Sequence, residues 1–156
     1  MADELVIRRA TAEDIAGVLA LYAQPDLDNG VVLELEEAKA LFARFAAYPN
    51  YVLYVAERGG EVVGSFALLV MDNLGHLGAP SAVVEDVVVS PACQSQGVGA
   101  KMMRFALEQA RQNNCYKIVL SSNLKRERAH AFYDSLGFTR HGYSFRMDLV
   151  EREAAE

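Results

Sequence analysis

Two adjacent carboxylates, Glu85 and Asp86, interrupt the otherwise apolar run 82–89. Neighbouring residues of a strand point to opposite faces, so both side chains cannot face solvent if this strand is central. Because burial of a lone carboxylate is costly, each needs a partner or a function. A carboxylate with a raised pKa can remove the proton of an ammonium group, directly or through water. The alternative is two structural ion pairs, with Arg146 or Lys117 as candidate partners.

A loop with two glycines follows this run and opens a long helix. A helix start leaves about four backbone N–H groups unpaired, and the helix dipole places roughly half a positive charge there. Because Gly97 and Gly99 have no Cβ, a diphosphate can approach these N–H groups closely. Gln94, Ser95 and Gln96 add neutral donors. The alternative is a plain strand-to-helix turn that happens to contain two glycines.

The wider pattern is more specific than the glycines alone. It reads Val87-Val88-Val89-Ser90-Pro91-Ala92-Cys93-Gln94-Ser95-Gln96-Gly97-Val98-Gly99. This pattern resembles the signature of the GNAT superfamily of acyl-CoA N-acetyltransferases, in which a hydrophobic strand leads into Q/R-x-x-G-x-G/A at a helix start. Gln94, Gly97 and Gly99 match the three defining positions. Ser95 departs from the pattern, since glycine or arginine is common there, so we expect less cationic help for a bound phosphate.

The resemblance implies acetyl-CoA as co-substrate and no metal. Backbone groups of Val87, Val88 and Val89 are expected to hydrogen-bond the pantetheine arm as though it were another strand. The N–H groups from about Gln94 to Ala100 are expected to hold the pyrophosphate. The coenzyme-binding residues implied in this way are Val87, Val88, Val89, Gln94, Ser95, Gln96, Gly97, Val98, Gly99, Ala100, Asn123, Phe132 and Tyr133.

The second half of the chain carries further matches to the superfamily. Asn123 follows a predicted strand, and the helix after it has the pattern F-Y-x-x-x-G-F, beginning at Phe132-Tyr133. By the resemblance, Tyr133 is the phenol that protonates the leaving thiolate as a general acid. The alternative is that Phe132 and Tyr133 are core aromatics, which is the simpler interpretation for Phe132. Residues 121–130 are also similar to those of aminoalkylphosphonate N-acetyltransferases.

The strand with the two carboxylates resembles that of glucosamine-6-phosphate N-acetyltransferases. Glu85 is therefore predicted to act as the base or to orient the amine, and Asp86 either contacts the substrate or braces the fold. His76 and Tyr22 are candidates for the acceptor pocket, although a lone loop histidine is often incidental. In this superfamily the segment after the first helix usually builds acceptor specificity.

These residues must be positioned by a regular alternation of elements. We expect strands at 5–10, 51–57, 62–71, 81–89, 116–121 and 138–149, and helices starting at 11 and 35 and spanning 97–113 and 125–136. The order β-α-α-β-β-β-α-β-α-β predicts an α/β (α+β) fold with a mixed, mostly antiparallel sheet and helices on both faces. We expect one domain over residues 1–150 and a frayed tail over 151–156.

Composition limits the partners and the location. The chain has 156 residues and a net charge of −6, which disfavours nucleic acid and anionic membranes. No apolar run approaches the ~20 residues of a membrane helix, and the N-terminus lacks the pattern of a signal peptide. Cys93 and Cys115 are expected to be free thiols in the cytoplasm, and a metal site would need more clustering of Cys and His.

The predicted function is transfer of an acetyl group from acetyl-CoA to a primary amine, by direct attack through a tetrahedral intermediate. The acceptor is expected to be a small molecule such as an amino sugar phosphate or an aminophosphonate. The alternatives are an enzyme that acetylates proteins or peptides, and a module that senses acyl-CoA without turnover. A homodimer is expected through an exposed edge of the predicted strand 138–149.

Overall fold

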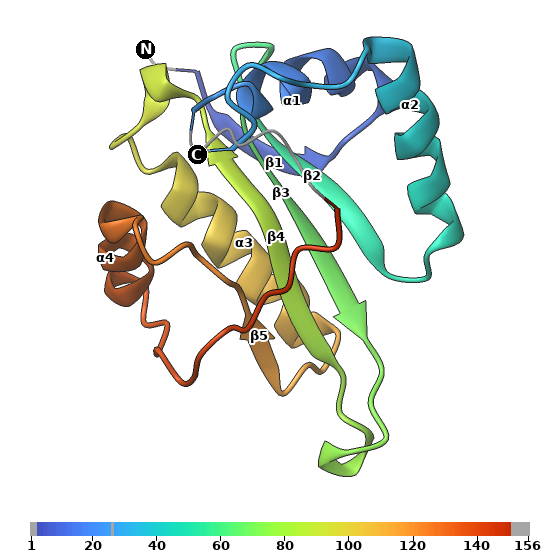
Figure 1. The fold of residues 1–156 in the computed structure, drawn as a ribbon, viewed down its shortest axis with the longest axis vertical. Coiled ribbons are helices and arrows are strands. Elements are labelled where there is room, and N and C mark those ends of the chain that lie inside the picture. The colour runs from blue at the N-terminus through green and yellow to red at the C-terminus, as the bar shows by residue number, and fades with distance from the viewer. Residues whose placement is uncertain (1–2, 26, 151–156) are drawn as a thin grey trace. The chain divides into compact units, whose positions relative to one another are not determined.

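The computed structural model describes residues 3–25 and 27–150 (Figure 1). These residues belong to two compact units, Met1–Val119 and Leu120–Glu156. The first unit holds the sheet and most of the helices, and the second holds one helix and an irregular segment. The predicted tail, 151–156, lies outside the described residues.

The sheet of the first unit has five strands in the order of the sequence. They are β1 (Leu5–Arg9), β2 (Tyr51–Arg58), β3 (Glu61–Met71), β4 (Ser81–Val89) and β5 (Lys117–Val119). The pairs from β1 to β4 are antiparallel, whereas β5 pairs with β4 in parallel. The mixed, mostly antiparallel sheet is thus confirmed.

Helices cover both faces of this sheet, as predicted (Figure 1). The helices are α1 (Ile15–Tyr22), α2 (Leu35–Arg44) and α3 (Val98–Gln112), and short 3-10 turns lie at Ala12–Asp14, Phe45–Ala47, His76–Gly78 and Pro91–Cys93. Residues of α1 and α2 pack against Leu53, Val55 and Ala67 in one core cluster. On the other face Tyr54 stacks on Phe66 and meets Phe105 of α3 edge to face.

The alternation along β2 explains this division. Leu53 and Val55 point to one face and Tyr54 to the other, because successive side chains of a strand alternate. Gly64 of β3 lets α3 approach closely, since a Cβ there would lie 2.9 Å from the Met102 sulfur. The core therefore has two layers, one on each face of the sheet to which β4 belongs.

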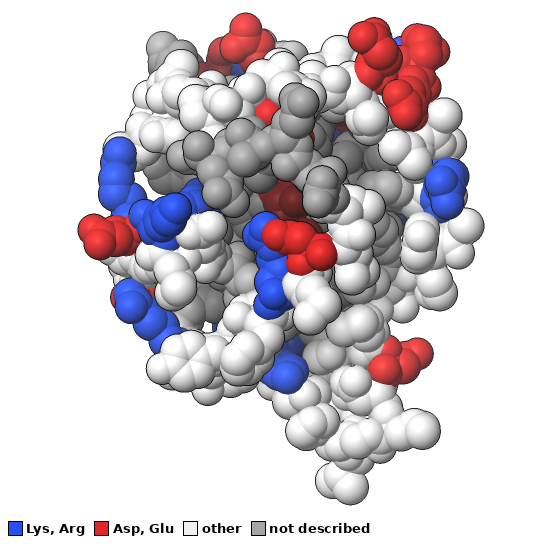
Figure 2. Space-filling model, in the orientation of Figure 1, with Lys and Arg blue, Asp and Glu red and all other residues white. Residues whose placement is uncertain are grey.

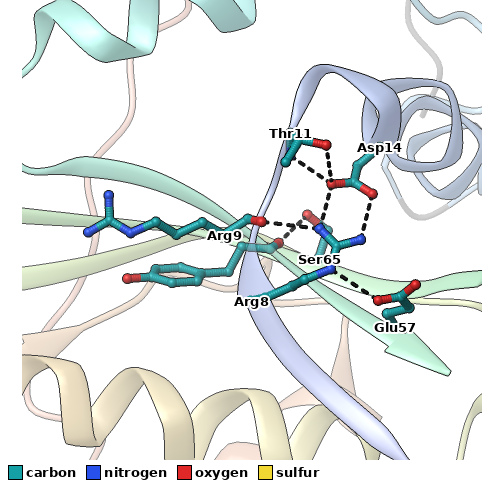
Figure 3. A network of polar contacts seen from close by, with 7 residues as sticks. Arg8, Arg9, Thr11, Asp14, Glu57 and Ser65 are labelled. Carbon is teal, nitrogen blue, oxygen red and sulfur yellow. Dashed lines mark hydrogen bonds and ion pairs between the residues drawn. The ribbon is translucent and has the colours of Figure 1, made fainter. Parts of the chain in front are cut away.

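The chain enters α1 through a polar network (Figure 3). Asp14 Oδ2 accepts a hydrogen bond of 2.7 Å from the Thr11 backbone N–H, which completes a capping box. The same carboxylate pairs with the Arg8 guanidinium at 2.7 and 2.9 Å. Arg8 also donates from Nε to Glu57 of β2 at 3.0 Å. The network ties β1, β2 and the start of α1 together.

The first turn of α2 is acidic. It carries Glu36 and Glu37, and Figure 2 shows acidic side chains gathered over this end of the helix. Carboxylates at a helix N-terminus are stabilised by the unpaired N–H groups and the helix dipole. This charge supports the helix and lies on its exposed side.

The second unit contains α4 (Glu127–Ser135). Gly137 ends it with a positive φ of 93°, and Phe138 N–H donates to the Tyr133 carbonyl, so the helix has a left-handed glycine cap. The predicted strand 138–149 is wrong, because residues 138–150 have no strand in the structure. A strand needs a hydrogen-bonded neighbour, and the described part of this unit offers none.

Candidate active site

The second half of β4 has an open edge. β5 pairs only with Ser81–Val83, so beyond Val83 this edge of β4 has no strand partner among the described residues of the first unit. On the other edge, Ser90 N–H donates to the Val63 carbonyl. Because hydrogen-bonded and non-hydrogen-bonded pairs alternate along an antiparallel ladder, the polar groups of Val89 point away from β3. The Gln24 side chain already donates to the Val89 carbonyl, at 3.0 Å. The Val89 N–H is the group of this residue that an extended ligand with amide groups can use.

A β-bulge lies at the two carboxylates. Glu85 pairs with Ala67 and Val88 with Ser65, so two residues of β4 face one residue of β3. Asp86 has a φ of 54°, in the left-handed region. Both Glu85 and Asp86 are exposed, which corrects the prediction that neighbouring side chains could not both face solvent. The bulge breaks the alternation on which that prediction rested.

The bulge places Asp86 in an acidic and aromatic environment. Partial desolvation, followed by the charge of Asp28, raises the pKa of the Asp86 carboxyl. Burial, followed by the negative charge of Asp86, raises the pKa of the Tyr22 phenol. Burial and the charges of Asp86 and Glu85 also raise the pKa of Tyr51. All of these groups approach the face that α1 covers, and a protonated amine would lower the energy of the clustered charges.

The ion pairs considered as the alternative are not formed within the first unit. Among its described residues, neither Glu85 nor Asp86 has a side-chain hydrogen bond or ion pair. Lys117 instead lies over the Tyr116 ring, with its Nζ 5.3 Å from the centroid. Arg146, in the second unit, pairs with Asp148 at 2.7 Å. Within the first unit, the two carboxylates therefore have no charged partner among the described residues.

The loop that follows β4 has the features of an anion site. Gly97 precedes α3 with a φ of 82°, and a Cβ there would meet nothing within 4 Å. Lys101 is the first residue to donate to the Gly97 carbonyl, so the preceding N–H groups of the helix have no intrahelical acceptor. Gln94 to Gly97 are exposed. A helix start with these features can bind an anion such as a diphosphate.

Ser95 adopts a backbone conformation that accounts for the glycine found at this position in the superfamily pattern. Its φ is 64°, a region that L-residues other than glycine, Asn and Asp rarely adopt. Glycine, which is common at this position in the superfamily, adopts it without strain. The loop thus keeps the same path with a serine, at a cost of about 1 kcal/mol in backbone energy.

Arg58 braces the loop from outside it. Its Nη1 donates to Gln96 Oε1 at 2.9 Å, and Gln96 Nε2 donates to the Ala92 carbonyl at 3.2 Å. The Arg58 Nε is buried and has no hydrogen-bond partner among the described residues. Arg58, at the end of β2, thus places a cation next to the loop. From the sequence alone, the loop was expected to have little cationic help.

His76 lies away from the carboxylates. It stacks on Tyr116, with ring centroids 4.2 Å apart, and precedes the first residue of β4, Ser81. Asp86 lies five positions after Ser81, which is about 16 Å along the strand from Ser81 at the usual rise per residue. The structure therefore does not bring His76 together with Asp86, whereas it does bring Tyr22 there.

The predicted residues of the second unit form a compact local arrangement. Tyr133 is buried and its ring contacts Phe132 and Phe138, with centroids 5.2 and 5.7 Å apart. Burial raises its pKa, which the charge of Arg126 partly offsets. The Asn123 side chain accepts from Lys125 N–H at 2.9 Å, so it organises the turn into α4. A phenol with a raised pKa stays protonated at neutral pH, as a proton donor requires.

Several residues of the site were not singled out from the sequence. Asp28 and Tyr51 interact electrostatically with Asp86, and neither belongs to a motif. Gln24 donates to the Val89 carbonyl at 3.0 Å and Arg58 to Gln96. The turn Asp28-Asn29-Gly30 was a signal for a fixed loop conformation, but no pattern in the sequence indicated the two long-range side-chain contacts.

Two kinds of site are absent from the described residues. No three side chains of His, Cys, Asp or Glu in residues 3–25 and 27–150 gather closely enough to hold a metal ion. No helix in this part of the chain is long and apolar enough to cross a membrane.

Comparison with known proteins identifies the family. The model of the acetyltransferase (GNAT) family matches residues 15–138. The chain is 33% identical over 139 residues to an aminoalkylphosphonate N-acetyltransferase of Salmonella typhimurium, covering 89% of this chain and 88% of the relative. It is 34% identical over 90 residues to a glucosamine 6-phosphate N-acetyltransferase of Trypanosoma brucei brucei, covering 58% of this chain and 59% of that protein.

A solved structure agrees with these matches over nearly the full length. It is a putative acetyltransferase from Agrobacterium tumefaciens, with a TM-score of 0.86 and 34% identity, and the match covers 92% of this chain and 99% of that structure. The open edge of β4, the bulge beside it and the glycine-led start of α3 lie within the residues that the family model matches. The chain belongs to the GNAT family of acetyltransferases.

Proposed function

We propose that this protein transfers the acetyl group of acetyl-CoA to the primary amine of a small molecule. The open edge of β4, which leads into the unpaired N–H groups of α3, is the observation that carries this proposal. Backbone groups of Val87–Val89 pair with the pantetheine arm, and Gln94–Ala100 hold the pyrophosphate. Arg58 supports the loop through Gln96 and supplies the cation that the loop itself lacks.

On the acceptor side, Asp86 and Glu85 receive the amine. The pKa of the Asp86 carboxyl is raised, and its charge acts on the Tyr22 phenol. We therefore assign to Asp86 the removal of the ammonium proton, directly or through water. Glu85, the first candidate from the sequence, orients the amine or shares the proton with Asp86. The neutral amine then attacks the thioester carbonyl directly. A backbone N–H near Val87–Val89 polarises the thioester carbonyl and stabilises the oxyanion of the tetrahedral intermediate, which then expels the coenzyme thiolate.

Tyr133 is proposed as the general acid that protonates the leaving thiolate. Its place in the F-Y-x-x-x-G-F pattern and its raised pKa support this role. Asn123 and Phe132 are proposed to contact the coenzyme, as in the superfamily pattern. Because transfer is direct, neither Cys93 nor Cys115 serves as a nucleophile.

The acceptor class follows from the relatives. The relatives described above are named for aminoalkylphosphonates and glucosamine 6-phosphate, both small primary amines with an acidic group. Aminophosphonates and amino sugar phosphates are therefore the first acceptors to test. The three carboxylates Glu85, Asp86 and Asp28 surround the site of the amine and contribute to binding its positive charge.

The experiment is a thiol-release assay with acetyl-CoA and a panel of amines. The panel contains 2-aminoethylphosphonate, glucosamine 6-phosphate, spermidine and a set of peptides. We expect turnover with at least one small amine. Activity confined to peptides would assign the protein to the alternative enzyme class. Tight binding of acetyl-CoA in calorimetry, without transfer to any amine, would instead indicate an acyl-CoA sensor.

The cytoplasmic location and the homodimer stay predictions from the sequence. The edge expected to form the dimer was the strand 138–149, which the structure does not contain, so a dimer must use another surface. Light scattering at micromolar concentration tests the dimer, and a monomeric mass would contradict it.

A further inference from the structure

Gln24 is the point at which three parts of the first unit are joined. Its backbone carbonyl accepts hydrogen bonds from the N–H groups of Leu27 and Asn29, at 3.1 and 3.0 Å. Its side-chain Nε2 donates to the carbonyl of Val89, at 3.0 Å. Gln24 follows the end of α1 by two positions, so one residue connects this helix, the turn after it and the end of β4.

The acceptor of this bond is a carbonyl that the sheet does not use. The polar groups of Val89 point away from β3, as the neighbouring Ser90–Val63 bond requires. The Gln24 side chain is half-buried and crosses 65 positions of sequence to reach it. A carbonyl left without a partner in such a setting carries a desolvation cost, so the bond is favoured over a free side chain.

The turn held by Gln24 carries Asp28. Asp28 N–H donates to the Tyr22 carbonyl at 3.0 Å, and Gly30 N–H donates to the Ala23 carbonyl at 2.8 Å. Asn29 and Gly30 have positive φ values of 50° and 86°, so the turn has a defined and partly strained path. The charge of Asp28 acts on Asp86 across this gap. The distance between the two carboxylates therefore depends on how firmly the turn is fixed to β4.

We propose that Gln24 is a positioning residue that fixes the acceptor-side turn at residues 27–30 to the coenzyme-side end of β4. This inference rests on the proposed function, in which β4 holds the coenzyme and Asp28 and Asp86 face the amine. Gln24 itself touches neither reacting group. Its bond sets the separation of the two carboxylates, and this separation sets how well the amine is bound and deprotonated.

A purely structural hydrogen bond would behave differently. If Gln24 only held the fold together, its loss would lower the melting temperature and leave the kinetic constants of the folded protein unchanged. If Gln24 is a positioning residue, its loss should affect the kinetic constants for the two substrates differently. It weakens use of the acceptor more than use of acetyl-CoA, because the start of α3 and the brace from Arg58 stay in place.

The test uses three variants of the full chain. Gln24→Met keeps the length of the side chain and removes the donor. Gln24→Glu replaces the donor with a carboxylate that repels the Val89 carbonyl. Gln112→Met is the matched control, since Gln112 is an exposed glutamine on α3 whose side chain donates to Glu108 in the same helix.

We expect Gln24→Met to raise the KM for the amine about five-fold, which corresponds to the loss of one hydrogen bond. Gln24→Glu should have a larger effect. The KM for acetyl-CoA should change less than two-fold, roughly, since that side keeps its contacts. The amine is whichever of 2-aminoethylphosphonate, glucosamine 6-phosphate or spermidine the wild-type protein acetylates, and Gln112→Met should match the wild type.

A second readout needs no substrate. Asp86 is faced by Tyr22 of α1, Asp28 of the turn, Tyr51 of β2 and its neighbour Glu85. If Gln24→Met lets Asp28 move away, titration of the Asp86 carboxyl by carbon NMR should show a lower pKa than in the wild type. Hydrogen exchange of the amides at residues 27–30 should be faster, whereas exchange in α3 should not change.

Three results would overturn the inference. The first is an unchanged Asp86 titration in Gln24→Met together with unchanged exchange at 27–30. The second is an equal rise in KM for both substrates. The third is a fall in KM for acetyl-CoA alone, which would mean that Gln24 competes with the coenzyme for the Val89 carbonyl. Absence of transfer by the wild-type protein would refute the proposed function, while the substrate-free readouts would still decide the role of Gln24.

Discussion

Asp14 and Asp86 are two aspartates of the same unit in opposite electrostatic situations. Asp14 is buried, receives two hydrogen bonds from Arg8 and one from the Thr11 backbone (Figure 3), and Arg8 lowers the pKa of its carboxyl. Asp86 is exposed and has no ion pair within the unit, and partial desolvation raises its pKa. The buried carboxylate is the one that is satisfied.

The difference separates a carboxylate with a full set of partners from one that has no ion pair within its unit. A carboxylate with a full set of partners is stabilised in its charged form and has no capacity left to take a proton at neutral pH. A carboxylate near other negative charges and without a cation takes a proton more readily. Burial alone would have suggested Asp14 as the reactive group, so the partners of a residue are more informative than its depth.

The largest effect is expected at Asp86. Asp86→Asn removes the charge and the proton acceptor and keeps the size, so kcat/KM for the amine should fall by about 100-fold or more. A steady-state assay with saturating acetyl-CoA measures this. Calorimetry should show acetyl-CoA binding unchanged, because the proposed coenzyme site lies along the backbone of β4 and at the start of α3.

Glu85→Gln is the control for this variant. It lies next to Asp86 on the same bulge, and a smaller loss of activity is expected if Asp86 is the main proton acceptor. Equal losses would mean that the two carboxylates act as a pair. Wild-type activity in Asp86→Asn would contradict the proposed role of Asp86 as proton acceptor.

Asp14 should have the opposite profile. Asp14→Ala removes the pair with Arg8 and the cap on Thr11, and should lower the free energy of unfolding by about 2 to 3 kcal/mol. Asp14→Asn should cost less, since its amide oxygen can still accept from Thr11. Denaturant unfolding measures both, and kcat/KM of the folded fraction should match the wild type. An activity loss without a stability loss would contradict the structural role.

The pH dependence of stability sharpens the contrast by its sign. The folded state raises the pKa of Asp86, so the folded state binds its proton more tightly and stability is lost as pH rises through the window above the usual Asp value. The folded state lowers the pKa of Asp14, so that contribution is lost as pH falls through its folded value. Relative to wild type, Asp86→Asn should gain melting temperature at neutral pH and not at pH 3.

That measurement consists of melting curves from pH 3 to pH 8 for both variants. Asp14→Asn should lose most melting temperature near neutral pH and approach the wild type in acid. Curves with the same sign for the two variants would mean that the two carboxylates do not differ as described.

The sequence predicted the parts that depend on local chemistry. The strands expected at 51–57 and 62–71 are confirmed as β2 and β3. The capping box at Thr11 and the glycine cap at Gly137 are likewise set by neighbours in the chain. β4 was expected at 81–89 and is found there. These elements need no knowledge of distant partners.

The parts that failed depend on partners far away in sequence. The bulge at Asp86 follows from the register of β3 against β4, which alternation alone does not reveal. The roles of Asp28, Gln24 and Arg58 arise from contacts across many positions. The apolar pattern after Phe138 indicated a strand, but a pattern does not supply a neighbouring strand with which to pair.

The smallest effect is expected at Glu57, the third member of the Arg8 network. Its carboxylate contacts Arg8 Nε at 3.0 Å, and about a third of each side chain is exposed, so solvent screens the pair. Glu57→Gln should therefore lower the free energy of unfolding by less than about 1 kcal/mol, with kcat/KM unchanged. In the double variant with Asp14→Asn, the two losses should not add, because both act on one guanidinium. Strict additivity in denaturant unfolding would show that Arg8 holds the two carboxylates independently, and the stable half of the comparison would then rest on Asp14 alone.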